Sequence, residues 1–184
     1  NPQPHLCRDN LFILPGDIRL SSLEEKLFEN EEYTVLNHAL SHDMYRNFDF
    51  CFLDTGPSLG ALTLNALLAS DELVIVVTPQ VFTLDGTSDC VKTIVEVWSK
   101  LGGKSRLSAV ILNRYDWRPV IYRTVKQELE NHFFDTMLKN TLSRSVKYEE
   151  SAETGFGLAE AQEESKQKKE TVRLGKELLS RING

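Results

Sequence analysis

The stretch that decides the fold is Phe48-Asp49-Phe50-Cys51-Phe52-Leu53-Asp54-Thr55-Gly56-Pro57-Ser58-Leu59-Gly60. An apolar run, residues 50–53, ends at Asp54 and gives way to a turn of small residues and proline. This pattern predicts a buried strand that delivers one carboxylate to a turn at its C-terminal end. Open α/β sheets place their ligand sites at that end of their strands. Asp54 is therefore a candidate functional residue, although a carboxylate that only caps a tight turn fits the same pattern.

The sequence downstream extends the motif. Residues 59–70 read Leu-Gly-Ala-Leu-Thr-Leu-Asn-Ala-Leu-Leu-Ala-Ser, and a second apolar strand follows and ends at Pro79. Together with Asp54 and Thr55, this resembles the ParA branch of the ParA/MinD ATPases. The resemblance covers roughly residues 10–160. It implies a single α/β domain over residues 1–184, with a doubly wound, mostly parallel sheet and helices on both faces, as in P-loop NTPases.

The resemblance also implies a nucleotide site. Asp54 would hold the Mg²⁺ of ATP through water, because a hard cation prefers oxygen ligands and keeps part of its water shell. Asn113, Arg144 and Pro79 fall where the family lines its nucleotide pocket. Asn113 fits equally well as a polar residue that ends a strand. In the segment around Arg144, Ser143 and Ser145 replace a proline and an asparagine of the ParA pattern, which puts adenine recognition in doubt.

The segment that binds phosphates in these ATPases does not occur in the 184 residues. It would read Gly-x-x-x-x-Gly-Lys-Ser/Thr, and residues 102–105, Gly-Gly-Lys-Ser, come nearest but precede an apolar strand and predict an αβ turn. The Asp-x-Asp strand end of ParA proteins is missing too. We therefore expect the C-terminal two thirds of a ParA fold, incomplete at the N-terminus. It would be a truncated chain, a fragmentary gene product or a relative that has lost its nucleotide site.

Without that segment, we expect these 184 residues alone neither to bind ATP with useful affinity nor to hydrolyse it. Whether the chain belongs to an active enzyme is left open, and no catalytic residue is assigned. In an intact relative the cofactors would be ATP and Mg²⁺, and the alternative for this chain is that it uses none.

Charge is distributed unevenly along the chain. Residues 1–103 carry a net charge of −9 (six basic, fifteen acidic residues), whereas residues 104–147, here called the basic block, carry +5 (nine basic, four acidic). Such a block predicts contact with a polyanion, or it is an ordinary solvated surface. The resemblance places the family's contacts to the DNA backbone on Arg118 and Lys147, both within the block.

The remaining expectations concern partners and location. Three cysteines without metal-like spacing fit a reduced cytoplasm, and no apolar run is long enough to span a bilayer. The resemblance implies non-specific DNA, a ParB-like stimulating protein and a homodimer, without a membrane, in the nucleoid of a bacterium. The alternative is a nucleotide-independent DNA-binding or dimerisation module. A MinD-like membrane regulator ranks last, because the C-terminal helix lacks a bulky apolar face.

Hydrophobic periodicity and caps predict the other elements. The first ten residues should have little fixed structure, and a capping box at Ser21 and Ser22 should open the first helix. Strands are expected within 10–17 and over 72–77, 107–112 and 136–142, and helices over 31–45, 62–69, 83–101 and 125–134 and at the C-terminus within 158–184.

Overall fold

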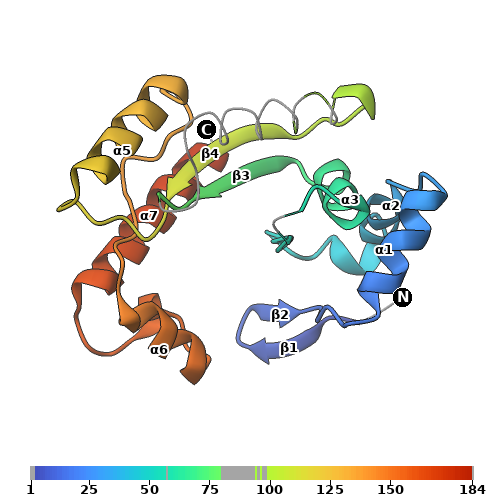
Figure 1. Cartoon of the computed structure of the whole chain (residues 1–184). Helices are drawn as coiled ribbons and strands as arrows, with labels where there is room; N and C mark the ends of the chain where they lie inside the picture. The colour runs from blue at the N-terminus through green and yellow to red at the C-terminus, as the bar shows by residue number, and fades with distance from the viewer. Residues whose placement is uncertain (1–2, 57, 80–93, 95, 97–98, 184) are drawn as a thin grey trace. The chain divides into compact units, whose positions relative to one another are not determined.

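The structure is a computed structural model that describes residues 3–56, 58–79, 94, 96 and 99–183. It divides into two compact units, shown in Figure 1. The first unit comprises residues 1–71 and 97–104, and the second comprises residues 72–96 and 105–184. Whether the whole chain forms a single domain stays a prediction.

The first unit begins with a hairpin. Strands β1 (His5–Arg8) and β2 (Leu11–Ile13) pair antiparallel, with Arg8 opposite Leu11. The two residues between them include Asn10, whose φ of 61° lies in the left-handed region that asparagine tolerates. The expectation of a structureless start was therefore wrong, because the Asp-Asn turn allows residues 5–8 to pair with the predicted strand.

The helices of the first unit are α1 (Leu20–Glu29), α2 (Val35–Leu40), the 3₁₀ turn η1 (Asp43–Tyr45) and α3 (Ala61–Ala69). The first and last of these confirm predicted helices, but the predicted capping box at the start of α1 does not form. The single helix expected over 31–45 is also wrong. The His42 ring accepts a hydrogen bond from the Met44 N–H, which starts a separate turn after α2.

Residues 50–53 do not form the buried strand that the sequence predicts. The structure assigns them no strand, and the Phe50 and Phe52 side chains are 45% and 79% exposed. A strand is stable only when its N–H and C=O groups pair with a neighbour, and neither two-stranded sheet includes this segment. The apolar run alone was therefore not a sufficient signal.

The second unit contains a parallel sheet. Strands β3 (Glu72–Val77) and β4 (Arg106–Leu112) pair in parallel and confirm the predictions for 72–77 and 107–112. The segment 136–142 runs beside β4, with one isolated parallel bridge between Val110 and Met137 but no continuous strand. The reason is that the Glu177 carboxylate accepts the backbone N–H groups of Lys139 and Asn140, which are then unavailable to a β ladder.

Helices cover both faces of this sheet. Val110 and Leu112 pack in one cluster with Leu129 of α5 (Val120–His132), and the alternate residues Ala109 and Ile111 pack with Leu174 of α7 (Lys166–Ile182). Alternation is expected, because successive side chains of a strand point to opposite faces. The doubly wound α/β arrangement is thereby confirmed (Figure 1).

In chain order, α6 (Val146–Thr154) and the 3₁₀ turn η2 (Leu158–Glu160) lie between α5 and α7. The expected helix over 83–101 lies mostly outside the described residues; of its described positions, 94, 96, 99 and 100 are helical, and Leu101 lies in a turn. The turn predicted at residues 102–105 is present, with Gly102 at a φ of 75°.

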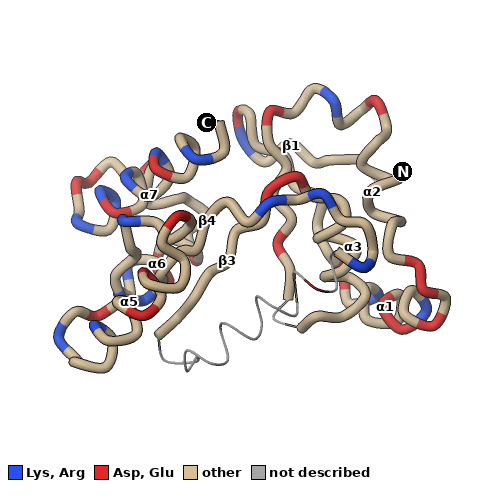
Figure 2. The backbone as a smooth tube through the Cα atoms, turned by 90° about the horizontal axis from the view of Figure 1, so that it is seen from above, with Lys and Arg blue, Asp and Glu red and all other residues tan. Residues whose placement is uncertain are grey.

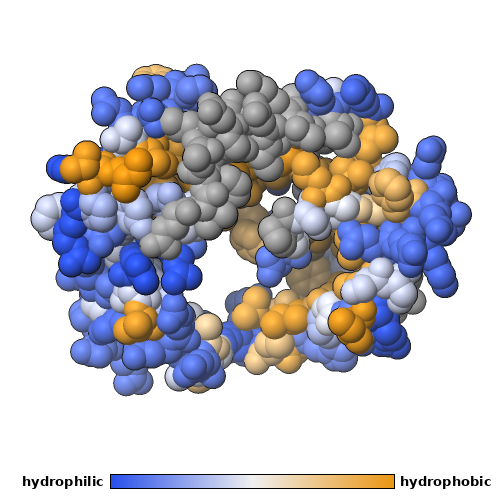
Figure 3. Space-filling model, viewed as in Figure 1, coloured by the Kyte–Doolittle hydropathy of each residue, from blue (hydrophilic) through white to orange (hydrophobic). Residues whose placement is uncertain are grey.

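Both units leave large apolar side chains at the surface, and Figure 3 shows apolar residues among hydrophilic ones on one face. Among the described residues, the large apolar ones that are more than 60% exposed are Leu6, Ile18, Phe28, Phe52, Trp117, Val120, Ile121, Phe134, Val146 and Phe156.

Candidate functional site

The ends of β3 and β4 are joined directly. The Asn113 N–H donates to the Val77 carbonyl at 2.8 Å, and Pro79, which is buried, follows two residues after Val77. These residues therefore lie at the carboxyl edge of the parallel sheet, where α/β proteins bind ligands.

The side chain of Asn113 is only partly committed. Its carbonyl oxygen accepts the N–H of Arg114 at 2.9 Å, and Arg114 has a φ of 55°, which is uncommon for a residue with a Cβ. Within the described residues, the amide NH₂ of Asn113 makes no hydrogen bond. It thus offers two donors at the strand end.

Arg144 is brought to the same edge by the chain that runs beside β4. The Tyr115 N–H donates to the Leu142 carbonyl at 2.9 Å, and the Arg144 N–H donates to the Tyr115 carbonyl at 3.2 Å. The Arg144 side chain is exposed. The second unit therefore brings together Pro79, Asn113 and Arg144, the three residues that the sequence assigns to the nucleotide.

The loop that carries Arg144 is held by a glutamate of α7. Glu170 Oε2 accepts the Ser143 N–H at 3.1 Å, the Ser143 hydroxyl at 2.7 Å and the Tyr148 hydroxyl at 3.2 Å. Burial, together with the neighbouring Glu170 charge, raises the pKa of Tyr148 to about 12. Ser145 caps α6, because its hydroxyl accepts the Lys147 N–H. The two serines that depart from the ParA pattern thus have structural roles of their own.

Arg118 is fixed by its neighbour Asp116. Its Nε lies 2.9 Å from Oδ1, its Nη2 lies 2.7 Å from Oδ2, and its backbone N–H donates to Oδ1 at 3.1 Å. These side-chain and backbone hydrogen bonds hold the pKa of Asp116 at about 2. The Arg118 side chain is 74% exposed, whereas that of Asp116 is 18% exposed. The guanidinium is therefore both oriented and accessible.

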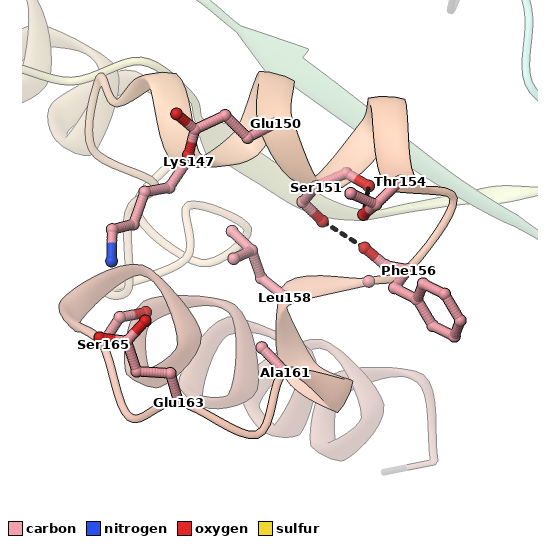
Figure 4. A pocket seen from close by; sticks show the side chains of 10 residues that line it. Lys147, Glu150, Ser151, Thr154, Phe156, Leu158, Ala161, Glu163 and Ser165 are labelled. Carbon is pink, nitrogen blue, oxygen red and sulfur yellow. Dashed lines mark hydrogen bonds between the residues drawn. The ribbon is translucent and has the colours of Figure 1, made fainter.

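Lys147 belongs to an open pocket of roughly 230 Å³, drawn in Figure 4. In that view Lys147 and Glu150 extend from α6, and Leu158, Ala161 and Ser165 lie across from them. The other lining residues are Ser151, Thr154, Phe156, Gly157 and Glu163. The lining therefore combines apolar side chains with the charged groups of Lys147, Glu150 and Glu163.

Acidic residues lie among the cations of the second unit, and several of the basic-block cations pair with them. Figure 2 shows Lys and Arg segments alternating with Asp and Glu segments in the second unit. Four of the nine cations of the basic block are in ion pairs, namely Arg106 with Glu72, Arg114 with Glu149, Arg118 with Asp116 and Lys126 with Glu130. The other five, Lys104, Arg123, Lys139, Arg144 and Lys147, make no ion pair within the described part of the chain.

Asp54 lies in the first unit, exposed and outside any helix or strand. The described residues contain no group of three or more His, Cys, Asp or Glu side chains that could hold a metal ion. A carboxylate that binds Mg²⁺ through water needs the phosphates of a nucleotide as further ligands. Asp54 as a metal ligand, and Pro79, Asn113 and Arg144 as nucleotide contacts, therefore stay predictions.

Sequence reasoning missed Asp116, Glu170 and Glu177. Asp116 had a local signal, since an Asp-x-Arg sequence directly before a helix can close on itself. The two glutamates had none, because their partners lie 22 to 38 residues away.

Across the described residues, no helix has the length and apolar character that crossing a membrane requires.

Comparison with known proteins gives concordant results. The model of the AAA domain family matches residues 5–108. The sporulation initiation inhibitor protein Soj of Bacillus subtilis (strain 168) is 31% identical over 147 residues, which cover 80% of this chain and 58% of that protein. The chromosome-partitioning ATPase Soj of Treponema pallidum (strain Nichols) is 26% identical over 172 residues, covering 94% of this chain and 68% of the relative.

A solved structure agrees in fold. An ATP complex of a Cyanothece McdA variant superposes with a TM-score of 0.74 at 22% identity, over 85% of this chain and 62% of that one. The chain spans about 58% to 68% of the length of these relatives. The family match, the relatives and the fold agree, and the chain belongs to the AAA domain family of P-loop ATPases, in its ParA/MinD branch.

Proposed function

We propose that this chain acts in DNA partition as a ParA-type protein. Its second unit would bind the adenine end of ATP at the joined ends of β3 and β4 and contact DNA through Arg118 and Lys147. The observation that carries the proposal is the convergence of Pro79, Asn113 and Arg144 at one carboxyl edge, held by backbone hydrogen bonds. The name of the Treponema pallidum relative, a chromosome-partitioning ATPase, supports the role in partition.

The chemistry of this edge suits a purine. Because the Asn113 oxygen is occupied by the Arg114 N–H, the side chain would act as a donor to a ring nitrogen of adenine. Arg144 adds a flat cation that can lie against a base. Bound Mg²⁺ would neutralise phosphate charge, with Asp54 as its ligand through water.

The assembled protein would be a homodimer in the bacterial cytoplasm, attached to the nucleoid through DNA rather than to a membrane, and a ParB-like partner would stimulate hydrolysis. The exposed apolar side chains support association, since β3 is the edge of its sheet among the described residues and Val76 on it is 55% exposed. Contacts from Arg118 and Lys147 to phosphates would carry no base information, so DNA binding would be independent of sequence.

The adenine proposal is tested by NMR on the ¹⁵N-labelled chain with ATP or GTP at millimolar concentration. We expect ATP to shift the backbone signals of residues 77–79, 113–115 and 142–144, and GTP to leave them in place. Asn113→Ala should abolish the shifts, whereas the exposed Asn131→Ala on α5 should not. Equal shifts with both nucleotides, or none with ATP, would refute base recognition at this edge.

The DNA proposal is tested by fluorescence anisotropy with a random duplex at two salt concentrations. The double variant Arg118→Ala, Lys147→Ala should bind more weakly, and its slope against log salt should fall by about 2. The matched control Arg123→Ala, Lys139→Ala loses the same charge from the basic block. If both double variants behave alike, Arg118 and Lys147 are no more than part of the general charge.

A second candidate is a DNA-binding or dimerisation module that works without nucleotide. The exposed apolar surface favours it, because association then needs no ATP. Light scattering with and without ATP and Mg²⁺ separates the two: a dimer that forms equally in both conditions favours the module, and one that requires ATP favours the ParA-type cycle.

A further inference from the structure

The same short loop occurs twice in this chain, each time just before a helix. Asp17-Ile18-Arg19 precedes α1, and Asp116-Trp117-Arg118 precedes the Pro119 cap of α5. In both, the aspartate accepts the backbone N–H of the arginine two residues on and binds its Nε and Nη2. The middle residue is exposed in both, Ile18 by 87% and Trp117 by 66%.

This loop determines the direction of its arginine. Arg118 Nε and Nη2 face Asp116, which leaves Nη1 without a hydrogen-bond partner among the described residues. The arginine side chain is 74% exposed and the aspartate 18%, so the guanidinium is accessible to solvent, and Nη1 is the edge left for a ligand. A guanidinium that is already oriented loses less rotamer entropy when it binds a phosphate.

We propose that Asp116 is a positioning residue that holds Arg118 with its Nη1 edge outward as a preformed contact for a DNA phosphate. The inference rests on the proposed DNA binding of the second unit. A positioning role and a simple effect of charge predict opposite changes in DNA binding when the carboxylate is removed. A carboxylate near a phosphate should repel it, so its removal should tighten binding if charge alone matters, and should weaken binding if orientation matters.

The test measures affinity for a random duplex by anisotropy. Asp116→Asn adds one unit of net charge but loses the Nη2 contact, and we expect affinity to fall by about twofold to fivefold, the range for one exposed ion pair. Asp116→Glu keeps the charge but moves the carboxylate, and should weaken binding as well. Asp17→Asn makes the same change in the matching loop of the first unit and should not weaken binding.

A double-mutant cycle tests the route of the effect. If Asp116 acts through Arg118, then Asp116→Asn combined with Arg118→Ala should bind no more weakly than Arg118→Ala alone. The Nε–H signal of Arg118, assigned by its loss in Arg118→Lys, should be sharp in the parent chain and broadened by exchange in Asp116→Asn, but unchanged in Asp17→Asn. Circular dichroism confirms that each variant is folded.

The possible results distinguish failure of the positioning role from failure of the proposed DNA binding. Binding by Asp116→Asn that equals or exceeds that of the parent, or a further loss in the double variant, overturns the positioning role while the proposed function stands. A parent chain without salt-dependent DNA binding overturns the proposed function and this inference with it.

Discussion

Replacing Glu170 by alanine should destabilise the protein more than the loss of any exposed charge. The carboxylate accepts three hydrogen bonds, from the Ser143 N–H, the Ser143 hydroxyl and the Tyr148 hydroxyl, and its side chain is 18% exposed. At about 1 kcal/mol net for each bond, Glu170→Ala should lower the free energy of unfolding by about 3 kcal/mol. The 3.5 Å ion pair with Lys166 adds less than about 0.5 kcal/mol, because Lys166 is exposed.

Urea unfolding followed by far-ultraviolet circular dichroism measures the effect. The matched control is Glu164→Ala, whose carboxylate is 63% exposed and pairs with Lys168, and which should cost less than about 1 kcal/mol. Glu170→Gln should recover much of the loss, since an amide oxygen can still accept these donors. A cost below about 1 kcal/mol, or equal costs for Glu170→Ala and its control, would refute the argument that this side chain anchors the loop of Arg144.

Three further outcomes can be measured on the same chain. Leu129 is 1% exposed, and Leu129→Ala should lower the free energy of unfolding by about 3 kcal/mol. Leu179 is 43% exposed, and Leu179→Ala should lower it by less than about 1 kcal/mol. Similar losses for the two variants in urea titrations would contradict the assigned core. Asn65, 3% exposed, accepts the Leu36 N–H and donates to two carbonyls, so Asn65→Leu should cost about 2–4 kcal/mol and a neutral effect would be inconsistent with this network. Burial raises the pKa of Glu177, but the hydrogen bonds from Lys139 and Asn140 outweigh burial and hold that pKa below the ordinary 4.5. The stability that this carboxylate contributes is therefore present above pH 4.5 and is lost as the pH falls through the lowered pKa. Glu177→Gln should accordingly flatten the acid side of a plot of unfolding free energy against pH, and an unchanged acid side would refute this.

The sequence predicted correctly those helices and strands that can be recognised from their own residues alone. β3, β4 and α3 were predicted within about one residue, because each is a contiguous apolar run with clear breakers at its ends. Residues 50–53 have an equally apolar run and form no strand, since a strand depends on a neighbour that a single segment cannot show. The start of α5 was placed five residues late, because its first turn carries the exposed Val120 and Ile121 and breaks the periodicity.

The positions of the candidate site residues were also predictable only in part. The positions of Pro79 and Asn113 follow from strand ends, and parallel strands end at a common edge. The placement of Arg144 followed from the family resemblance and not from its own segment, because the loop that carries it is held by Glu170 and Glu177, whose partners are far away in sequence. The pairing of Arg118 with Asp116 could have been found from their spacing before a helix, but charge counting treats the two as separate surface groups.

The two glutamates of α7 also set which sequence changes the loop tolerates. Glu177 accepts the main-chain N–H of Lys139, a group that every residue except proline possesses. Position 139 therefore tolerates any residue except proline without loss of this hydrogen bond. Position 143 is different, because Ser143 gives Glu170 both its N–H and its hydroxyl. The proline of the ParA pattern would supply neither, so in this chain a return to the family residue would be a deleterious substitution unless position 170 changed with it.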